Sequence, residues 1–218
     1  GDTSSAFSGA LAAHYHRIPI AHIEAGLRTY KEDPFPEEAN RRLISHLATF
    51  HFCPTESAKS ALNKEGIHKK IHIVGNTVID ALKLGSKKIS PKKNTAPSIV
   101  VTCHRRENIG NNLINICDAL IEISAKHPST NIIFPIHLNK QIKTVVTNKL
   151  SQVPNITLCS PLSYSEMISE MTNCTLILTD SGGIQEEAAS LGKPVLILRT
   201  VTERTEGIEQ NIAKLIGT

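Results

Sequence analysis

Short apolar runs alternate with amphipathic stretches along nearly the whole chain. The apolar runs are rich in Ile, Leu and Val on both faces, which is typical of parallel strands that are covered on both sides. The amphipathic stretches repeat their apolar residues at helical spacing. The first half therefore predicts strands at residues 18–24, 51–54 and 70–75, and helices at residues 4–16, 37–49, 55–66 and after Asn76.

The second half repeats this alternation after a polar, proline-bounded segment, SPKKNTAP, at residues 90–97. Such a segment is typical of an interdomain linker. Beyond it, Leu113, Ile116, Cys117 and Leu120 share one face of a predicted helix, so we expect them in the core. The strands of this half are predicted at residues 98–103, 131–136, 155–159, 175–179 and 194–198.

These elements predict an α/β fold of two doubly wound domains, at residues 1–90 and 98–218. The first domain has only three predicted strands, whereas a doubly wound domain usually needs more to bury both faces of its sheet. The chain also opens at Gly1 with no initiator Met and no strand before its first helix. We therefore expect the first domain to be incomplete and the chain to be part of a longer two-domain protein.

The segment TLILTDSGGIQEEAASLG, at residues 175–192, carries the strongest local signal for a ligand. A buried strand runs into the turn Ser181, Gly182 and Gly183, and a helix is predicted from Ile184. Glycines allow close approach of the backbone, and the unpaired N–H groups of a first helical turn favour phosphate oxygens. Glu186 and Glu187 are predicted in or near that turn, where a carboxylate stabilises the helix or accepts hydrogen bonds from ribose hydroxyls.

Composition narrows the class of protein. Of 218 residues only 4% are aromatic and none is Trp, which favours an aliphatic α/β interior. The net charge of +4 is scattered along the chain. Its one lysine cluster has no interleaved aromatic residues, so we interpret it as a solvated linker rather than a nucleic-acid site. That cluster comprises Lys87, Lys88, Lys92 and Lys93.

The cysteines and the hydropathy indicate a reduced, non-membrane environment. The five cysteines lack CxxC spacing and fall mostly in apolar patterns, so we expect reduced core residues. No apolar run approaches the ~20 residues that cross a bilayer, and the start is no signal peptide. We therefore expect a cytoplasmic protein, and no motif predicts a metal or another cofactor. The cysteines are Cys53, Cys103, Cys117, Cys159 and Cys174.

Several polar residues fall at predicted strand ends or helix starts, where open α/β folds bind ligands. Each has a structural alternative: Asp2 as a helix N-cap, Glu24 as a partner of Arg28, and Glu37 with Glu38 as complements of a helix dipole. Together, however, three carboxylates near one cleft raise one another's pKa values, which supplies both a base and an acid near neutral pH. A histidine and arginines facing them could hold a diphosphate.

Eight strings of the chain, in order, resemble a known family: GDT, IEAGLRT, PEEANRR, GNTVIDAL, TCHRREN, PIHLN, TDSGGIQEEAASLGKPVL and RTVTERTEG. They closely resemble bacterial non-hydrolysing UDP-N-acetylglucosamine (UDP-GlcNAc) 2-epimerases. The resemblance implies two Rossmann-like domains in a glycosyltransferase-B-like arrangement, with the active site in the cleft between them. It also implies an isomerase that interconverts UDP-GlcNAc and UDP-ManNAc by eliminating UDP to give 2-acetamidoglucal and adding it back.

The resemblance also implies roles for individual residues. Asp2, Glu24 and Glu37 would be the acid/base and cation-stabilising carboxylates, and oxocarbenium character at C1 makes carboxylates there reasonable. His104 would be a catalytic contact to the diphosphate. The implied substrate-binding residues are Ser181 and Gly183 on phosphate, Gly182 beside them, Glu187 on the ribose and Arg204 on the diphosphate or sugar. Arg105 and His137 match contacts to an activating second UDP-GlcNAc in some members.

Departures from the family pattern define what we expect of this chain. The glycine-rich region and basic substrate-binding residues that precede Asp2 in the family are absent, as is the terminal helix. Met167 stands where a phenylalanine contacting uridine is usual, and Asn211 and Ile212 replace glycine and threonine. Because part of the substrate site is lacking, we expect little or no activity from this 218-residue chain by itself.

Three alternatives remain open at this stage. A hydrolysing relative would release free ManNAc and UDP, and it shares much of the motif set. A glycosyltransferase would share the diphosphate loop, although the carboxylates Asp2, Glu24 and Glu37 argue against it. A non-catalytic remnant would bind UDP or nothing. From the family alone, the full-length form is expected to be a homodimer.

Overall fold

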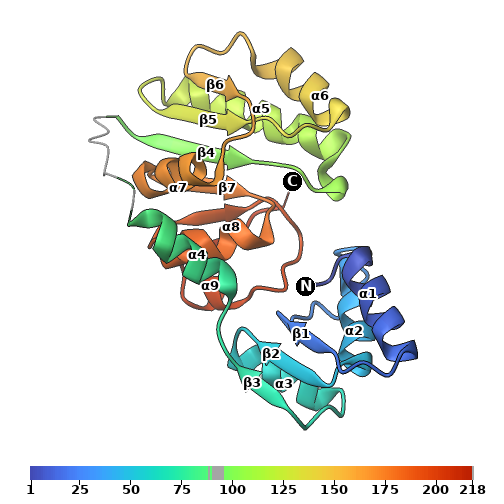
Figure 1. Cartoon of the computed structure of the whole chain (residues 1–218). Helices are drawn as coiled ribbons and strands as arrows, with labels where there is room; N and C mark the ends of the chain where they lie inside the picture. Colours follow the sequence, from blue (N-terminus) through green and yellow to red (C-terminus); the bar gives the residue numbers. More distant parts are fainter. Residues whose placement is uncertain (88, 90–95, 218) are drawn as a thin grey trace. The chain divides into compact units, whose positions relative to one another are not determined.

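The structure of the chain is a computed structural model that describes residues 1–87, 89 and 96–217. These residues form two compact units, Gly1–Thr77 and Val78–Thr218 (Figure 1). The division falls at the start of a helix whose Leu82 belongs to the core of the second unit. The linker predicted at residues 90–97 lies mostly outside the described residues. The division between the two units falls at the start of α4 (Thr77–Ser86).

The first unit is built on a parallel sheet of order β1-β2-β3. Its helices begin where threonine caps are available: the Thr3 hydroxyl accepts from the Ala6 N–H and the Thr55 hydroxyl from the Ala58 N–H. Asp2 is therefore not the N-cap of the first helix, because Thr3 takes that position. The elements are α1 (Ser4–Tyr15), β1 (Ala21–Ile23), α2 (Glu37–Leu47), β2 (Phe50–Cys53), α3 (Glu56–Lys64) and β3 (Ile71–Ile73).

Two histidines lie side by side in the interior of this sheet. His22 of β1 and His51 of β2 are register partners, and both are buried. Nε2 of each ring lies within hydrogen-bond distance of a backbone carbonyl, that of Gly1 for His22 (3.0 Å) and that of Ser45 for His51 (2.9 Å). Burial, with a smaller contribution from His51, lowers the pKa of His22 to about 4, against the Gly1 hydrogen bond, which raises it.

The stability of the first unit should therefore fall on acidification. The unfolded state takes up a proton on His22 near pH 6.5, whereas the folded state does so only near pH 4, so the stabilisation present above pH 6.5 is lost between these values. The uptake of one proton over that interval lowers the free energy of unfolding by an amount on the order of 3 kcal/mol. Urea unfolding from pH 7 to pH 4 measures it. His22→Gln should flatten the dependence and the exposed His14→Gln should not; an unchanged His22→Gln profile would refute the assignment.

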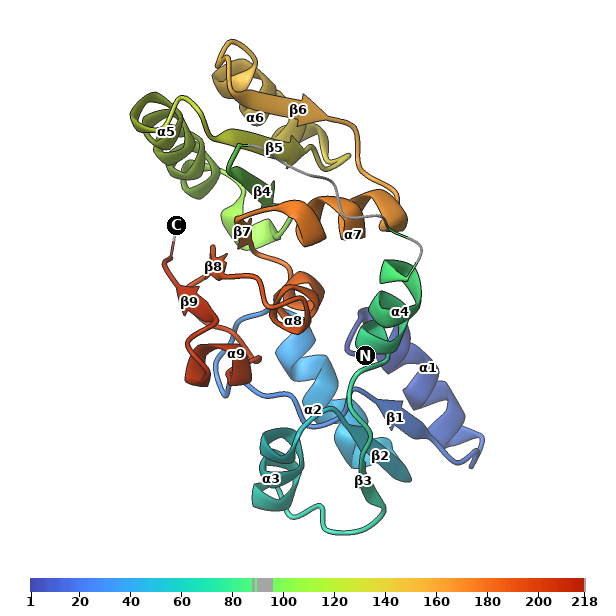
Figure 2. The same ribbon diagram turned by 90° about the vertical axis from the view of Figure 1, so that its left-hand side faces the viewer.

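The second unit is a six-stranded parallel sheet of order β6-β5-β4-β7-β8-β9, with helices on both faces (Figure 2). Alternate residues of the central strands face opposite ways: Val101 and Leu178 pack with α5 and α6, whereas Val100 and Ile177 pack with α4, α7 and α8. The elements after α4 are β4 (Ser98–Thr102), the 3₁₀ turn η1 (Arg106–Asn108), α5 (Asn111–Lys126), β5 (Asn131–Pro135), α6 (Lys140–Leu150), β6 (Ile156–Cys159), α7 (Tyr164–Asn173), β7 (Leu176–Thr179), α8 (Gly182–Ser190), β8 (Val195–Ile197), α9 (Glu206–Glu209) and β9 (Ala213–Leu215).

The strand order creates a crevice between β4 and β7. From β4 the chain proceeds outward through β5 and β6, then crosses back to β7 on the other side and proceeds outward again. At such a reversal the connections leave β4 and β7 toward opposite faces, and ligands of open α/β sheets bind at the carboxyl ends of these strands. The crevice therefore lies where residues 103–106 and 180–183 follow their strands.

The predicted α/β fold and its parallel sheets are confirmed, but the predicted start of one helix is wrong and two short elements were missed. Helix α8 begins at Gly182 rather than Ile184, which places Glu186 and Glu187 beyond its first turn. Strand β9 and helix α9 were not predicted, because both are short and partly polar.

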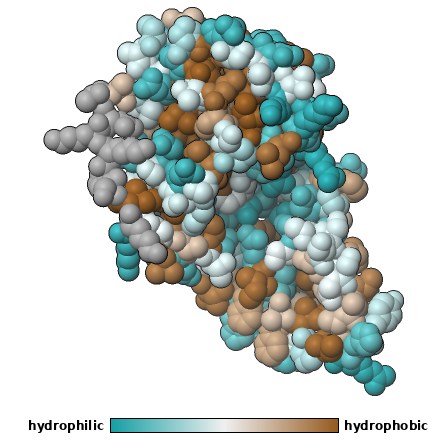
Figure 3. Space-filling model, turned by 45° about the horizontal axis from the view of Figure 1, so that its top comes forward, coloured by the Kyte–Doolittle hydropathy of each residue, from teal (hydrophilic) through white to brown (hydrophobic). Residues whose placement is uncertain are grey.

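The cysteines and the surface agree with the expectations from composition. All five cysteines are free, and all but Cys159 are buried. The face in Figure 3 shows hydrophobic residues scattered among hydrophilic ones. Among the described residues, none of the helices combines the length and the hydropathy of a membrane span.

Candidate functional site

The floor of the crevice in the second unit is made by two threonines at the last positions of their strands. Thr102 of β4 and Thr179 of β7 are register partners, and their hydroxyls lie 2.6 Å apart. The Thr179 hydroxyl also accepts the N–H of Ser181 at 2.9 Å, which turns the backbone into the start of α8. Paired hydroxyls at this point hold the two strand ends in register and aim both following loops at one place.

Asp180, the residue between β7 and the glycine pair, joins these two loops. Its carboxylate is fully buried and accepts the N–H groups of His104 (2.9 Å) and Arg105 (2.8 Å) and the side-chain amide of Asn108 (2.9 Å). The His104 ring lies beside it, with Nδ1 3.1 Å from Oδ1. Burial raises the pKa of Asp180, but the hydrogen bonds and charge of His104, with the N–H of Arg105, outweigh it and lower the pKa.

The turn after Asp180 presents the N-terminus of α8. Ser181 is the N-cap residue, and its side chain makes no capping hydrogen bond. A Cβ added to Gly183 would meet no atom within 4 Å, so the helix start is open at this residue. The dipole of the nine-residue helix and the backbone N–H groups of its first turn are features that favour an anion, and the anion site itself stays a prediction.

Gly182 has a different reason to be glycine. A Cβ at this position would lie 2.3 Å from an Nη atom of Arg204, so the missing side chain makes room for that guanidinium. Arg204 also forms short ion pairs with Glu186 of α8 and with Glu203. The predicted diphosphate ligand Arg204 is thereby held against the first turns of α8.

Behind Arg204 lies a buried ion cluster that the sequence did not reveal. The Arg199 side chain is fully buried, and its Nε donates to Glu107 at 3.0 Å and its Nη1 to Glu203 at 3.3 Å. Arg199 follows β8 and Glu107 lies in η1, so this cluster ties the loops after β4 and β8 together.

Glu187, the predicted ribose ligand, is buried in the middle of α8. It accepts a hydrogen bond from the Tyr164 hydroxyl at 2.9 Å. Burial raises the pKa of Glu187, and the Tyr164 bond opposes this; burial and the carboxylate raise the pKa of Tyr164 to about 12. A carboxylate with one hydroxyl partner already in place is chemically suited to hydroxyl groups of a sugar.

The two residues matched to an activator site lie next to His104. The His137 and His104 rings are 5.8 Å apart between centroids, and the Arg105 N–H is held by Asp180. They therefore border the same crevice as the predicted diphosphate contact.

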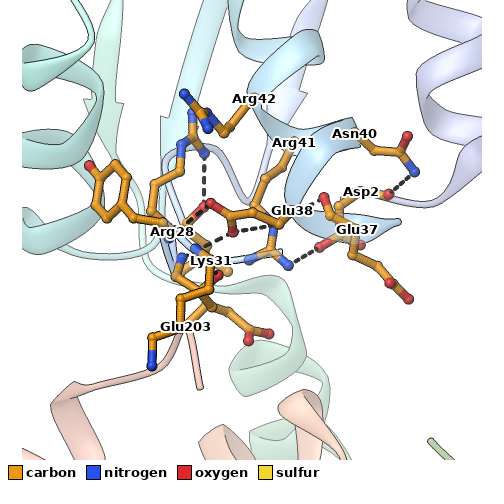
Figure 4. Close-up of polar contacts among 12 residues, drawn as sticks. Asp2, Arg28, Lys31, Glu37, Glu38, Asn40, Arg41, Arg42 and Glu203 are labelled. Atoms are coloured by element: carbon orange, nitrogen blue, oxygen red, sulfur yellow. Dashed lines mark hydrogen bonds and ion pairs between the residues drawn. The ribbon is translucent and has the colours of Figure 1, made fainter. Parts of the chain in front are cut away.

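In the first unit, Asp2 is held by helix α2 (Figure 4). Its carboxylate lies 3.1 Å from Nη2 of Arg41, and the Asn40 side-chain amide donates to its backbone carbonyl at 2.8 Å. Arg41 is buried, and its Nε donates to the backbone carbonyl of Glu37 at 3.3 Å. One guanidinium therefore connects the Asp2 carboxylate to the start of the helix that carries Glu37.

Glu24 lies at the end of β1, near the same segment. It accepts a hydrogen bond from the Asn76 side chain at 3.0 Å, and a Cβ on Gly1 would be 4.0 Å from its Oε2. Arg28, which the structural alternative paired with Glu24, forms an ion pair with Glu65 at 2.8 Å. Asp2 thus connects to the start of the helix that carries Glu37 through Arg41.

Glu38 differs from its neighbour Glu37. Both lie in the first turn of α2, as the helix-dipole interpretation predicts. The Glu38 carboxylate is buried, accepts the N–H groups of Thr29 and Tyr30, and lies 3.8 Å from Nε of Arg41. Glu38 therefore fixes the loop ahead of α2.

The predicted site residues thus fall into two groups, one in each unit. Sequence reasoning missed their buried partners Asp180, Arg199 and Arg41. The position of Asp180 directly after a buried strand was a usable signal. Arg199 and Arg41 gave no signal, because the sequence does not distinguish a buried arginine from an exposed arginine. Among the described residues, no group of three or more His, Cys, Asp or Glu side chains could hold a metal ion.

Comparisons with known proteins agree on one family. A family model described as UDP-N-acetylglucosamine 2-epimerase matches residues 1–218. The UDP-N-acetylglucosamine 2-epimerase of Campylobacter jejuni is 46% identical to the chain, over 100% of the chain and 62% of the relative.

Solved structures are similar over the same extent. The UDP-GlcNAc 2-epimerase of Neisseria meningitidis, bound to UDP-GlcNAc, is 44% identical with a TM-score of 0.97, over 100% of this chain and 62% of that one. The Methanocaldococcus jannaschii enzyme, in complex with UDP-GlcNAc and UDP, is 38% identical with a TM-score of 0.88, over 100% and 63%. The chain thus spans somewhat over three fifths of these relatives, and it belongs to the UDP-N-acetylglucosamine 2-epimerase family.

Proposed function

We propose that the protein is a non-hydrolysing UDP-GlcNAc 2-epimerase, an isomerase that interconverts UDP-GlcNAc and UDP-ManNAc. The observation that carries the proposal is the crevice between β4 and β7. There an open helix start, a buried carboxylate for a sugar hydroxyl, a histidine and an arginine converge at one strand reversal. Relatives of similar fold are described as bound to UDP-GlcNAc and UDP, which fits such a site.

In the proposed binding mode, the second unit holds the leaving group. Backbone N–H groups at Ser181 and Gly183 would donate to phosphate oxygens, and Glu187 would accept from ribose hydroxyls. His104 would face the diphosphate. Arg204 would exchange part of its pairing with Glu186 for a phosphate oxygen, which is a charge-conserving change of partner.

In the proposed reaction, a carboxylate of the first unit removes the proton from C2 while the C1–O bond to UDP breaks. The electron pair of the C–H bond forms the double bond of 2-acetamidoglucal, and the bonding pair to oxygen leaves with UDP. UDP then adds back to C1 and a proton is delivered to the opposite face of C2. Asp2, Glu24 and Glu37 are the proposed acid, base and cation-stabilising groups.

Product analysis tests this function against its nearest alternative. The full-length protein, incubated with UDP-GlcNAc, should produce UDP-ManNAc until the two sugar nucleotides reach equilibrium, which NMR measures. Free ManNAc and UDP in equal amounts would instead select a hydrolysing epimerase. No turnover at protein concentrations that bind UDP by calorimetry would reduce the protein to a nucleotide-binding remnant.

We further propose a cytoplasmic homodimer without a metal or other cofactor. The free, mostly buried cysteines suit a reducing compartment. Sedimentation of the full-length protein measures the oligomeric state.

A further inference from the structure

His104 reaches the crevice as a half-exposed ring whose orientation is set from behind. Its side chain is 40% exposed, whereas the Asp180 side chain next to it is fully buried. A carboxylate can accept but not donate a hydrogen bond once ionised, so at 3.1 Å the hydrogen lies on Nδ1 of His104. Nε2 is then the ring nitrogen that remains for a ligand.

Asp180 fixes more of this loop than the ring. It accepts the backbone N–H groups of both His104 and Arg105, and Asn108 bridges it to the Leu198 carbonyl at 3.1 Å. The backbone and the ring of His104 are therefore held by the same carboxylate, which immediately precedes the Ser181 turn. A displacement of Asp180 would move His104 and the proposed phosphate site together.

Asp180 is also the charged neighbour of the ring. Groups facing His104 are Asp180, the neighbouring His137 ring and, on its own loop, Arg105. The buried Cys103 thiol also faces Asp180, and burial together with that carboxylate raises the thiol's pKa far above its usual range, so it stays neutral. Asp180 is thus the one anion among these groups, and its carboxylate lies directly behind the ring that faces the proposed diphosphate site.

We propose that Asp180 is a positioning residue for catalysis, which holds His104 in its Nδ1–H tautomer and directs Nε2 at the diphosphate. The inference rests on the proposed epimerase function and adds a residue to it. Asp180 need not touch the substrate, because it acts through His104.

A double-mutant cycle separates this role from a purely structural one. Asp180→Asn keeps the size of the side chain but presents an amide that cannot both accept from the backbone and receive the Nδ1–H. We expect kcat to fall by about 10²-fold or more, with KM for UDP-GlcNAc changed less than about threefold. In a His104→Asn background the same substitution should lower kcat by less than about threefold.

Additive losses in the cycle would overturn the proposal, because Asp180 would then act independently of His104. Asn108→Ala serves as the control for loop damage: it also removes a partner of Asp180, and its effect should persist in the His104→Asn background. All these variants are made in the full-length protein, and an inactive full-length wild-type protein would instead refute the epimerase function.

A measurement on the unmodified chain needs neither turnover nor the variant. The ¹⁵N chemical shifts of the His104 ring should show a protonated Nδ1 and an unprotonated Nε2 at pH 8. A ring found mainly as the Nε2–H tautomer would refute the positioning role even if Asp180→Asn does not fold.

Discussion

Replacing Arg41 by methionine should destabilise the first unit by about 3–5 kcal/mol, the usual effect of removing one partner from a buried ion pair. The substitution leaves the Asp2 carboxylate and the buried Glu38 carboxylate without their shared cation, at 3.1 Å and 3.8 Å. The link from Asp2 to the backbone of Glu37 is lost with it. Urea unfolding of the 218-residue chain, followed by a probe in the first unit, measures the change.

The next residue is a matched control. Arg42 lies on the same helix with a half-exposed side chain and a 3.8 Å ion pair to Glu65, so Arg42→Met should change the free energy of unfolding by less than about 1 kcal/mol. Arg41→Lys should fall between, because it keeps the charge but not the planar donor geometry. Equal losses for Arg41→Met and Arg42→Met would contradict the role given to the buried pair.

The second large effect we expect is that of replacing Arg199 by methionine. This substitution should lower the free energy of unfolding of the second unit by about 3 kcal/mol. Glu203 would keep its pair with Arg204, whereas Glu107 would lose the Arg199 bond at 3.0 Å. The loop after β8 would then be released from η1. Because Arg204 belongs to that loop, the affinity for UDP should fall by about tenfold. Chemical unfolding and calorimetry with UDP measure the two effects.

The exposed Arg106, one position from Glu107, provides the comparison. Arg106→Met should leave both the stability of the second unit and UDP affinity nearly unchanged. Loss of stability in Arg199→Met without any loss of UDP affinity would show that the cluster does not hold Arg204 for the ligand.

The fold could be predicted from the sequence because its strands are aliphatic and its helices amphipathic. Val100, Val101 and Leu178 indicate burial through their own side chains, and the two strands they belong to, β4 and β7, follow from that. Strand β9 was not predicted because its central Lys214 is exposed and its hydropathy pattern covers only three residues, Ala213–Leu215. The start of α8 was placed two residues late because Gly182 and Gly183 are poor helix formers, which tertiary packing around Arg204 overrides.

The site was predictable where strand ends dictate it and not where partners are distant. His104 and Ser181 follow buried strands, so the topology alone brings them to one edge of the sheet. The pairing of His104 with Asp180 joins residues 76 positions apart, and that of Asn40 with Asp2 joins residues 38 apart. No local pattern states which carboxylate meets which donor, because that depends on the assembled backbone.

Isotope exchange at C2 tests the proposed function most directly. The full-length protein would be incubated with UDP-GlcNAc in deuterated water, and both sugar nucleotides would be isolated and examined by NMR. Elimination and re-addition of UDP should place deuterium at C2 of UDP-GlcNAc and of UDP-ManNAc alike. UDP-ManNAc that retains hydrogen at C2 would contradict removal of that proton by a carboxylate of the first unit.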